Sequence, residues 1–239
     1  RNKIILKGGP GVGKSSFMKK IAEDFAARQI DLEYHWCSSD NNSLDGITAG
    51  NRQVCVLDGT APHTVDPRYP GAIDRIINLG EYWDTDIIAA NRENIVKLTD
   101  SIGLCFQRAY NRLAEARLAL AEWKSYIKEA TNTDSVNRNV LALGDDFLRH
   151  SPKSNTAPRH LFAAAITPEG IVTKAESLVE NSFTVTAVKG SPGGGCQDLF
   201  KDVERIINLS GVFAEIYHCP FDPQNIDIII IPENNSMLI

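Results

Sequence analysis

A glycine-rich segment near the start of the chain places the strongest limit on what it can fold into. Four residues occupy the fixed positions of the pattern G-x-x-x-x-G-K-[ST], namely Gly8, Gly13, Lys14 and Ser15. The apolar run 4–6 precedes the segment, and residues 16–27 carry apolar side chains at helical spacing. A strand, a glycine-rich turn and a helix in this order aim backbone N–H groups at phosphate oxygens. The sequence therefore predicts a nucleotide-binding loop.

The residue types in this loop match the chemistry of a bound triphosphate. Glycines permit positive φ and bring the backbone close to the anion. Lys14 is expected to reach the β- and γ-phosphates, and the Ser15 hydroxyl is expected to coordinate Mg²⁺. The predicted nucleotide-binding residues are Gly8, Gly9, Pro10, Gly11, Val12, Gly13, Lys14, Ser15 and Ser16.

Asp58 is the second predicted magnesium residue, beside Ser15. It follows the apolar run 54–57, which is typical of a buried parallel strand. A carboxylate at such a strand end holds Mg²⁺ through water. Lys14 and Asp58 are therefore predicted catalytic residues.

The catalytic base must come from elsewhere, because the residue after Asp58 is Gly59 and not an acid. Three candidates are Asp40, Asp45 and His63. The two aspartates are equally consistent with turn capping. His63 is either a sensor of the γ-phosphate or an ordinary loop residue.

The first part of the chain recurs later at an offset of 182 residues. Residues 189–195 align with 7–13, and Glu33, Cys37, Asp40 and Asp45 align with Glu215, Cys219, Asp222 and Asp227. Such self-similarity predicts two structural units of one kind. Under the same offset the last residue, Ile239, aligns with Leu57. With no methionine at position 1, this predicts a fragment of a longer tandem protein.

The second copy of the loop lacks two of the four defining residues. Cys196 stands in place of Lys14, and Gln197 in place of Ser15. The segment can still form an anion-binding turn, but it is predicted not to support catalysis. Cys196 is open to two interpretations, a reactive thiol at a helix N-terminus or an inert remnant.

Charge and cysteine content argue against several functional classes. The formal net charge is −5 and no segment is rich in lysine and arginine, which argues against nucleic acid as the main partner. No apolar run is long enough to span a membrane. Five scattered cysteines favour a reducing compartment and no disulfide framework.

The predicted fold class is α/β, with a doubly wound, mainly parallel sheet, a long helical insertion and an incomplete second unit. The expected domains are 1–150, with a helical arm over about 85–150, and 156–239. Within them we expect a strand at 31–37, a polar loop at 38–46, a hairpin at 161–174 and a strand at 183–188.

Residues 85–130 are predicted to form a long helix, with a shorter helix over 134–150. Gly103 is a candidate interruption. The two helices form either a hairpin that packs on itself or a lid or partner-binding arm. In the second case Arg92, Arg108 or Arg112 would offer positive charge to a nucleotide.

Several motifs together resemble a bacterial family of tandem, duplicated P-loop ATPase-like proteins. They occupy residues 7–16, 35–40, 43–46, 58–63, 66–71 and 159–162. The resemblance implies a duplicated nucleotide-binding fold, ATP binding and a cytoplasmic location, and no particular substrate. Relatives also keep Lys and Ser or Thr in the second loop, so Cys196 and Gln197 depart from the family pattern.

These observations predict a magnesium-dependent ATPase with one intact and one degenerate site. ATP is favoured over GTP because no Asn-Lys-x-Asp motif occurs. One alternative is a small-molecule or nucleoside kinase, with Asp40 or Asp45 holding the acceptor. Another is an ATP-dependent switch or scaffold with little turnover, in which P-loop units pair or the chain self-associates.

Overall fold

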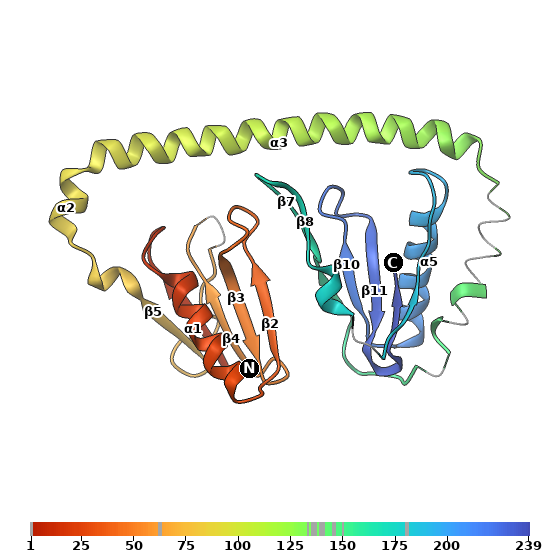
Figure 1. The fold of residues 1–239 in the computed structure, drawn as a ribbon, viewed down its shortest axis with the longest axis horizontal. Helices are drawn as coiled ribbons and strands as arrows, with labels where there is room; N and C mark the ends of the chain where they lie inside the picture. Colours follow the sequence, from red (N-terminus) through yellow and green to blue (C-terminus); the bar gives the residue numbers. More distant parts are fainter. Residues whose placement is uncertain are drawn as a thin grey trace. The chain divides into compact units, whose positions relative to one another are not determined.

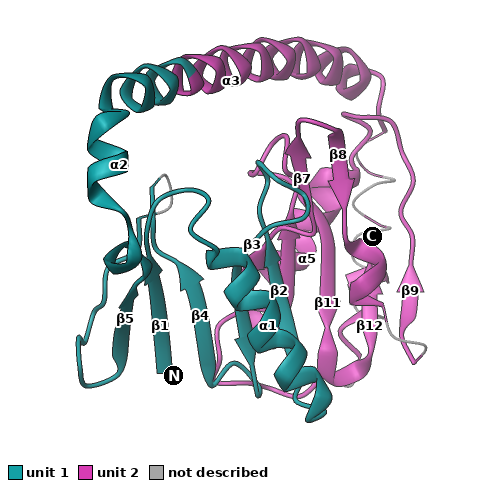
Figure 2. Cartoon of the chain, turned by 60° about the vertical axis from the view of Figure 1, so that its left-hand side comes forward, with its two compact units in different colours: residues 1–101 teal, residues 102–239 magenta. Residues whose placement is uncertain are grey.

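The chain divides into two compact units, residues 1–101 and 102–239 (Figure 2). The computed structural model describes residues 2–61, 64–132, 134, 138, 142–144, 147–149, 151–179 and 182–239. The division falls within the longest helix, α3 (Arg92–Glu129), seen as the yellow to green ribbon of Figure 1. The boundaries predicted from sequence, 1–150 and 156–239, assign that helix to the first unit alone.

The first unit is built on a five-stranded mixed sheet of order β2-β3-β4-β1-β5. β1 pairs in parallel with β4 and β5, whereas β3 is antiparallel to both β2 and β4. The elements are β1 (Asn2–Lys7), α1 (Lys14–Ala27), β2 (Leu32–Trp36), β3 (Leu44–Ala49), β4 (Val54–Asp58), β5 (Asp74–Asn78) and the 3₁₀ helix η1 (Leu79–Tyr82).

The predicted doubly wound, mainly parallel sheet is wrong. The prediction assigned residues 38–46 to a polar loop and joined parallel strands through helices. In the structure, β3 begins at Leu44 and forms a hairpin with β2. Parallel neighbours need a crossover of a dozen or more residues, and the short segment 37–43 permits only an antiparallel return. The prediction of a strand ending at Asp58, parallel to β1, is confirmed.

One face of the first sheet is covered by α1. The helix turns its buried residues Lys14, Met18 and Ala22 toward the sheet at a spacing of four residues. The two apolar members pack against the strands in one cluster with Leu6, Leu44, Ile47 and Val56. The core therefore fixes α1 against the sheet, with β3 contributing Leu44 and Ile47 to the contact.

The second unit contains a five-stranded mixed sheet of order β6-β10-β11-β12-β9 and a separate hairpin. The hairpin predicted over 161–174 is confirmed over residues 164–173, and its turn contains Gly170 with φ of +104°. The elements are β6 (Arg159–Leu161), β7 (Ala164–Thr167), β8 (Gly170–Thr173), η2 (Ala175–Leu178), β9 (Thr184–Thr186), α5 (Cys196–Ser210), β10 (Glu215–His218), β11 (Ile226–Ile231), η3 (Pro232–Asn234) and β12 (Ser236–Leu238).

Four strands of each sheet repeat in register, whereas the fifth strands differ, because β5 pairs with β1 and β6 pairs with β10. Adding 182 to each residue of the pair Ile47–Val56 gives Ile229–Leu238, and both pairs are aligned between antiparallel strands. The parallel pair β1–β4 likewise corresponds to β9–β12. Even the irregularity in β2 at positions 35 and 36 recurs in β10 at 217 and 218. The duplication predicted from the sequence is therefore confirmed at the level of individual residue pairs.

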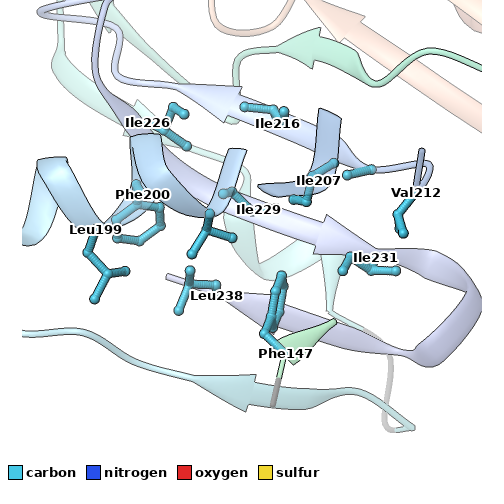
Figure 3. Packing of buried hydrophobic residues seen from close by; sticks show 12 residues of the cluster. Phe147, Leu199, Phe200, Ile207, Val212, Ile216, Ile226, Ile229, Ile231 and Leu238 are labelled. Atoms are coloured by element: carbon cyan, nitrogen blue, oxygen red, sulfur yellow. The ribbon is translucent and has the colours of Figure 1, made fainter. Parts of the chain in front are cut away.

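α5 covers the second sheet as α1 covers the first. Val203 and Ile207 are fully buried against the strands, and Phe147 contributes to the same cluster (Figure 3). The opposite face of this sheet is also covered, because Tyr217, Ile228 and Met237 pack with residues before β9. The second sheet is thus buried on both faces.

The predicted long helix is present but begins after a short one. α2 (Thr85–Ala90) is capped by Asp84, whose carboxylate accepts from the Ile87 N–H at 3.1 Å. α3 then runs for 38 residues, and Gly103 does not interrupt it. No residue of α3 is buried. In the part of the chain that the structure covers, no helix has the length and hydrophobicity for a membrane crossing.

The second predicted helix, over 134–150, lies mostly outside the described residues. Gly144 and Phe147 are among those described, and Phe147 is buried in the core of the second unit. The strand predicted at 183–188 is present as β9, and the one at 31–37 as β2.

Candidate phosphate-binding site

The predicted loop connects β1 to α1, as its sequence pattern requires. Gly11 and Gly13 have φ of +80° and +87°, a region that L side chains rarely adopt. Gly13 caps α1 without any side-chain hydrogen bond, so the first N–H groups of the helix are available to another acceptor. This arrangement suits an anion at the positive end of α1.

Lys14 is buried, with only 8% of its surface exposed. Its Nζ donates to the carbonyl oxygens of Gly8 at 2.7 Å and Gly9 at 2.8 Å, and lies 3.5 Å from an Asp58 carboxylate oxygen. A buried ammonium requires such partners, because desolvation of an unpaired charge is costly. The structure therefore brings together the two predicted catalytic residues Lys14 and Asp58.

Ser15 joins the start of α1 to β3. Its Oγ accepts a hydrogen bond of 3.0 Å from the Leu44 backbone N–H. A hydroxyl oxygen has two lone pairs, so one stays available to a metal ion. Ser15 thus has a structural role that the sequence pattern did not reveal, in addition to the predicted metal role.

Thr60 completes the contact between the Asp58 strand end and the loop. Its backbone N–H donates to Asp58 Oδ1 at 2.9 Å, and its hydroxyl donates to the Gly8 carbonyl at 2.8 Å. The sequence analysis did not single out this residue. Its position two residues after a strand-end aspartate is the signal that could have identified it, since aspartates often bind the N–H two residues on.

Lys7 anchors the segment that follows Asp58. Its Nζ donates to the carbonyls of Gly59 at 2.8 Å and Val65 at 2.9 Å, and to Asp66 Oδ1 at 3.2 Å. The lysine directly before the loop therefore holds a second segment against the end of β1. This contact was also not expected from the sequence.

An aromatic side chain packs on the outer part of the loop. A Cβ added to Gly9 would lie 3.2 Å from the Trp83 ring, and one added to Gly8 would lie 2.8 Å from Val12. A side chain at Gly8 would therefore be strained, since φ there is also +147°, and one at Gly9 would require a small shift of the indole. Trp83 itself is 41% exposed, so one part of the indole contacts the loop and another faces solvent.

The candidate base Asp40 is engaged within its own turn. It accepts hydrogen bonds from the Asn42 N–H at 3.1 Å and the Ser43 hydroxyl at 2.6 Å. These two bonds hold the pKa of the Asp40 carboxyl below its ordinary value of 3.8. A carboxylate with a lowered pKa is a weaker base, and the geometry matches turn capping.

Of the two other candidate bases, one belongs to β3 and one is not described. Asp45 interacts with the Cys37 thiol, whose pKa is raised by burial first and by this carboxylate in addition. His63 lies outside the described residues. Among the residues described, no group of three His, Cys, Asp or Glu side chains forms a metal centre.

The second loop keeps the shape of the first with other residues. Gly193 and Gly195 have φ of +88° and +94°, like Gly11 and Gly13. Gln197 replaces Ser15, and its Oε1 accepts from the Ile226 N–H at 3.1 Å, the bond equivalent to that between Ser15 and Leu44. Cys196 carries a free thiol and lies against Gly190.

These sites were compared with known proteins. No protein-family model, curated protein or solved structure matches the chain. The resemblance to tandem P-loop ATPase-like proteins therefore stays a prediction, and the functional argument rests on the residues described above.

Proposed function

We propose that the first unit binds ATP with Mg²⁺ at the loop of residues 8–16 and hydrolyses it. The observation that carries this proposal is the buried Lys14 ammonium, held by two loop carbonyls beside Asp58. An ammonium at this point would exchange neutral carbonyl partners for charged phosphate oxygens, which are stronger acceptors. The N–H groups at the start of α1 point to the same place.

The residues around the loop also fit a magnesium ion. Ser15 Oγ and the Asp58 carboxylate are hard oxygen donors, and phosphate oxygens and water would complete the shell. Magnesium, when bound, neutralises charge on the β- and γ-phosphates. Thr60 and Lys7 hold Asp58 and the following segment in position. The chain's own contribution is thus positioning and charge, which account for most of the catalysis in phosphoryl transfer.

The location proposed for this activity is the cytoplasm. Cys37, Cys105, Cys196 and Cys219 carry free thiols, and Cys37 is half-buried. Free thiols persist in a reducing compartment, which is also where ATP is plentiful.

The first test is calorimetric titration with ATP and Mg²⁺ of the original chain, Lys14→Ala and Lys20→Ala. Lys20 is an exposed lysine on the same helix and serves as a charge-matched control. Loss of a charged hydrogen-bonding partner costs about 1.5–3 kcal/mol. We therefore expect Lys14→Ala to weaken binding roughly tenfold to hundredfold, and Lys20→Ala to leave it unchanged. Equal affinity in all three proteins would refute the site.

Release of inorganic phosphate then separates hydrolysis from the alternatives. Phosphate release that depends on Lys14 supports the ATPase. Transfer of phosphate to an added nucleoside or metabolite, with little release to water, would favour the kinase.

A switch with little turnover has one observation in its favour, the engagement of Asp40 within its own turn. Tight binding without phosphate release, with a change in oligomeric state measured by light scattering, would support that alternative over the ATPase.

A further inference from the structure

The second unit contains a cavity of about 500 Å³ beside the altered loop. Its wall combines the loop residues 190–195, the first turns of α5, the segment 219–225 and the last third of α3. All of these segments belong to the second unit. The volume lies within the roughly 300–1,000 Å³ typical of pockets for small organic ligands.

α3 meets the loop at Gly193. A Cβ added to this glycine would lie 2.9 Å from the Lys124 Cα, a distance that real side chains do not reach. Its φ of +88° also disfavours any other residue. Glycine at this position therefore allows the α3 backbone to contact the loop, which brings the side chains of one α3 face to the cavity.

The cavity has an excess of positive charge from elements outside the loop. Lys124 and Lys128 come from α3, and Lys201 comes from α5, against the acids Asp198 and Asp222. Lys124 Nζ lies 3.7 Å from Asp222 Oδ2, and that same oxygen accepts from Asn225 Nδ2 at 2.8 Å. Three lysines against two aspartates leave the lining with a net charge of +1, although the loop itself has no lysine at position 196.

The cavity also offers apolar surface next to these charges. Leu120 and Phe221 line it together with Pro192 of the loop. A ligand that satisfies both parts carries several negative charges at one end and a flat or apolar group at the other. A nucleoside polyphosphate has this composition.

We propose that this cavity binds a nucleoside polyphosphate without Mg²⁺ and without hydrolysing it. The phosphates would lie at the loop and contact Lys124 and Lys128, and the base would lie against Leu120 and Phe221. Gln197 carries an amide in place of the Ser15 hydroxyl, which is the group expected to coordinate Mg²⁺ in the first loop. This inference is independent of the hydrolysis proposed for the first loop.

The test uses the full chain with Lys14→Ala, so that the first site does not contribute, and ATP in the presence of EDTA. Binding is followed by the rate at which N-ethylmaleimide alkylates Cys196, measured by peptide mass spectrometry. Cys196 lines the cavity and is only partly buried, so a bound ligand shields it. We expect saturating ATP to slow alkylation of Cys196 at least tenfold and to leave that of the exposed Cys105 unchanged.

Three substitutions in this background locate the ligand. Lys124→Ala and Lys128→Ala should each weaken the protection by ATP about tenfold, in line with the loss of one charged hydrogen bond. Lys97→Ala, which removes an exposed lysine on α3 that does not line the cavity, should have no effect. Asp222→Asn should strengthen binding, because it removes the carboxylate that competes for Lys124.

Two results would overturn the proposal. One is unchanged alkylation of Cys196 at millimolar ATP while thermal unfolding shows an intact chain. The other is equal protection by inorganic triphosphate, which would mean that the nucleoside contributes nothing. Because the readout is Cys196 without magnesium, neither result depends on whether the first loop binds ATP.

Discussion

The two copies of the repeat have the same strand pairs in the same register, yet they carry different side chains at the loop. Lys14 and Ser15 in the first copy become Cys196 and Gln197 in the second. The glycine conformations and the bond from position 15 or 197 to the third strand of its copy are retained. The comparison teaches that the backbone shape of this loop does not depend on a lysine and a serine at these two positions, because the shape persists where both are replaced.

The largest expected effect comes from matched core substitutions in the two copies. Ile47 and Ile229 occupy equivalent positions and are 1% and 0% exposed. Ile47→Ala and Ile229→Ala should each lower the free energy of unfolding by about 2–5 kcal/mol, through lost burial and a residual cavity. Denaturant titration should show that each variant shifts the transition of its own unit. A single transition lowered equally by both would mean that the copies unfold together.

A smaller effect is expected from the bond between the start of each helix and the third strand of its copy. Ser15→Ala leaves the Leu44 N–H without this partner and should cost about 1 kcal/mol of stability. Ser15→Gln, which imitates the second copy, should recover most of that loss. Both variants should lose magnesium-dependent ATP binding in the same calorimetric titration. If stability falls equally in the two variants, glutamine cannot replace serine as the acceptor of this bond, and the prediction is wrong.

The smallest effect concerns Asp227, a partly buried acid in the second copy. Burial raises the pKa of Asp227 above its ordinary value of 3.8, although Cys219 and His218 oppose the shift. The folded chain then binds this proton more tightly than the unfolded chain, so the free energy of unfolding falls as pH rises through the raised pKa. Stability from this source is greatest below pH 3.8.

The substitution that tests this effect of Asp227 is Asp227→Asn. Removing the charge should raise the melting temperature at pH 7 by about 1–3 °C, and the gain should shrink toward pH 3. Asp202→Asn, at a more exposed site on the same unit, should show no such gain. A gain that stays constant with pH would point to packing and not to ionisation.

The loop and its surroundings could be predicted because each link is local in sequence. A strand, a glycine turn and a helix follow one another within about 25 residues, and Asp58 follows an apolar run. Contacts such as those of Lys7 and Thr60 join segments some 50 residues apart, and no local pattern specifies them.

β3 was missed because its own signal is weak. Leu44–Ala49 contains an aspartate and a glycine, and three polar residues, 41–43, precede it. The second copy carries the same strand as Ile226–Ile231, which is almost wholly apolar. Applying the 182-residue offset to this strong strand would have identified the weak one, and with it the antiparallel hairpin.

Ser15 and Gln197 each accept an equivalent hydrogen bond from the third strand of their own copy. This equivalence has a consequence for how duplicated genes evolve. A residue whose side-chain oxygen supports the backbone is constrained in the copy by that hydrogen bond, whatever other role the residue has. Only side chains that still present an oxygen to the third strand preserve the loop. A duplicate of this kind is therefore expected to drift toward glutamine, asparagine or threonine there, and to keep a ready-made frame in which a new ligand can be accommodated.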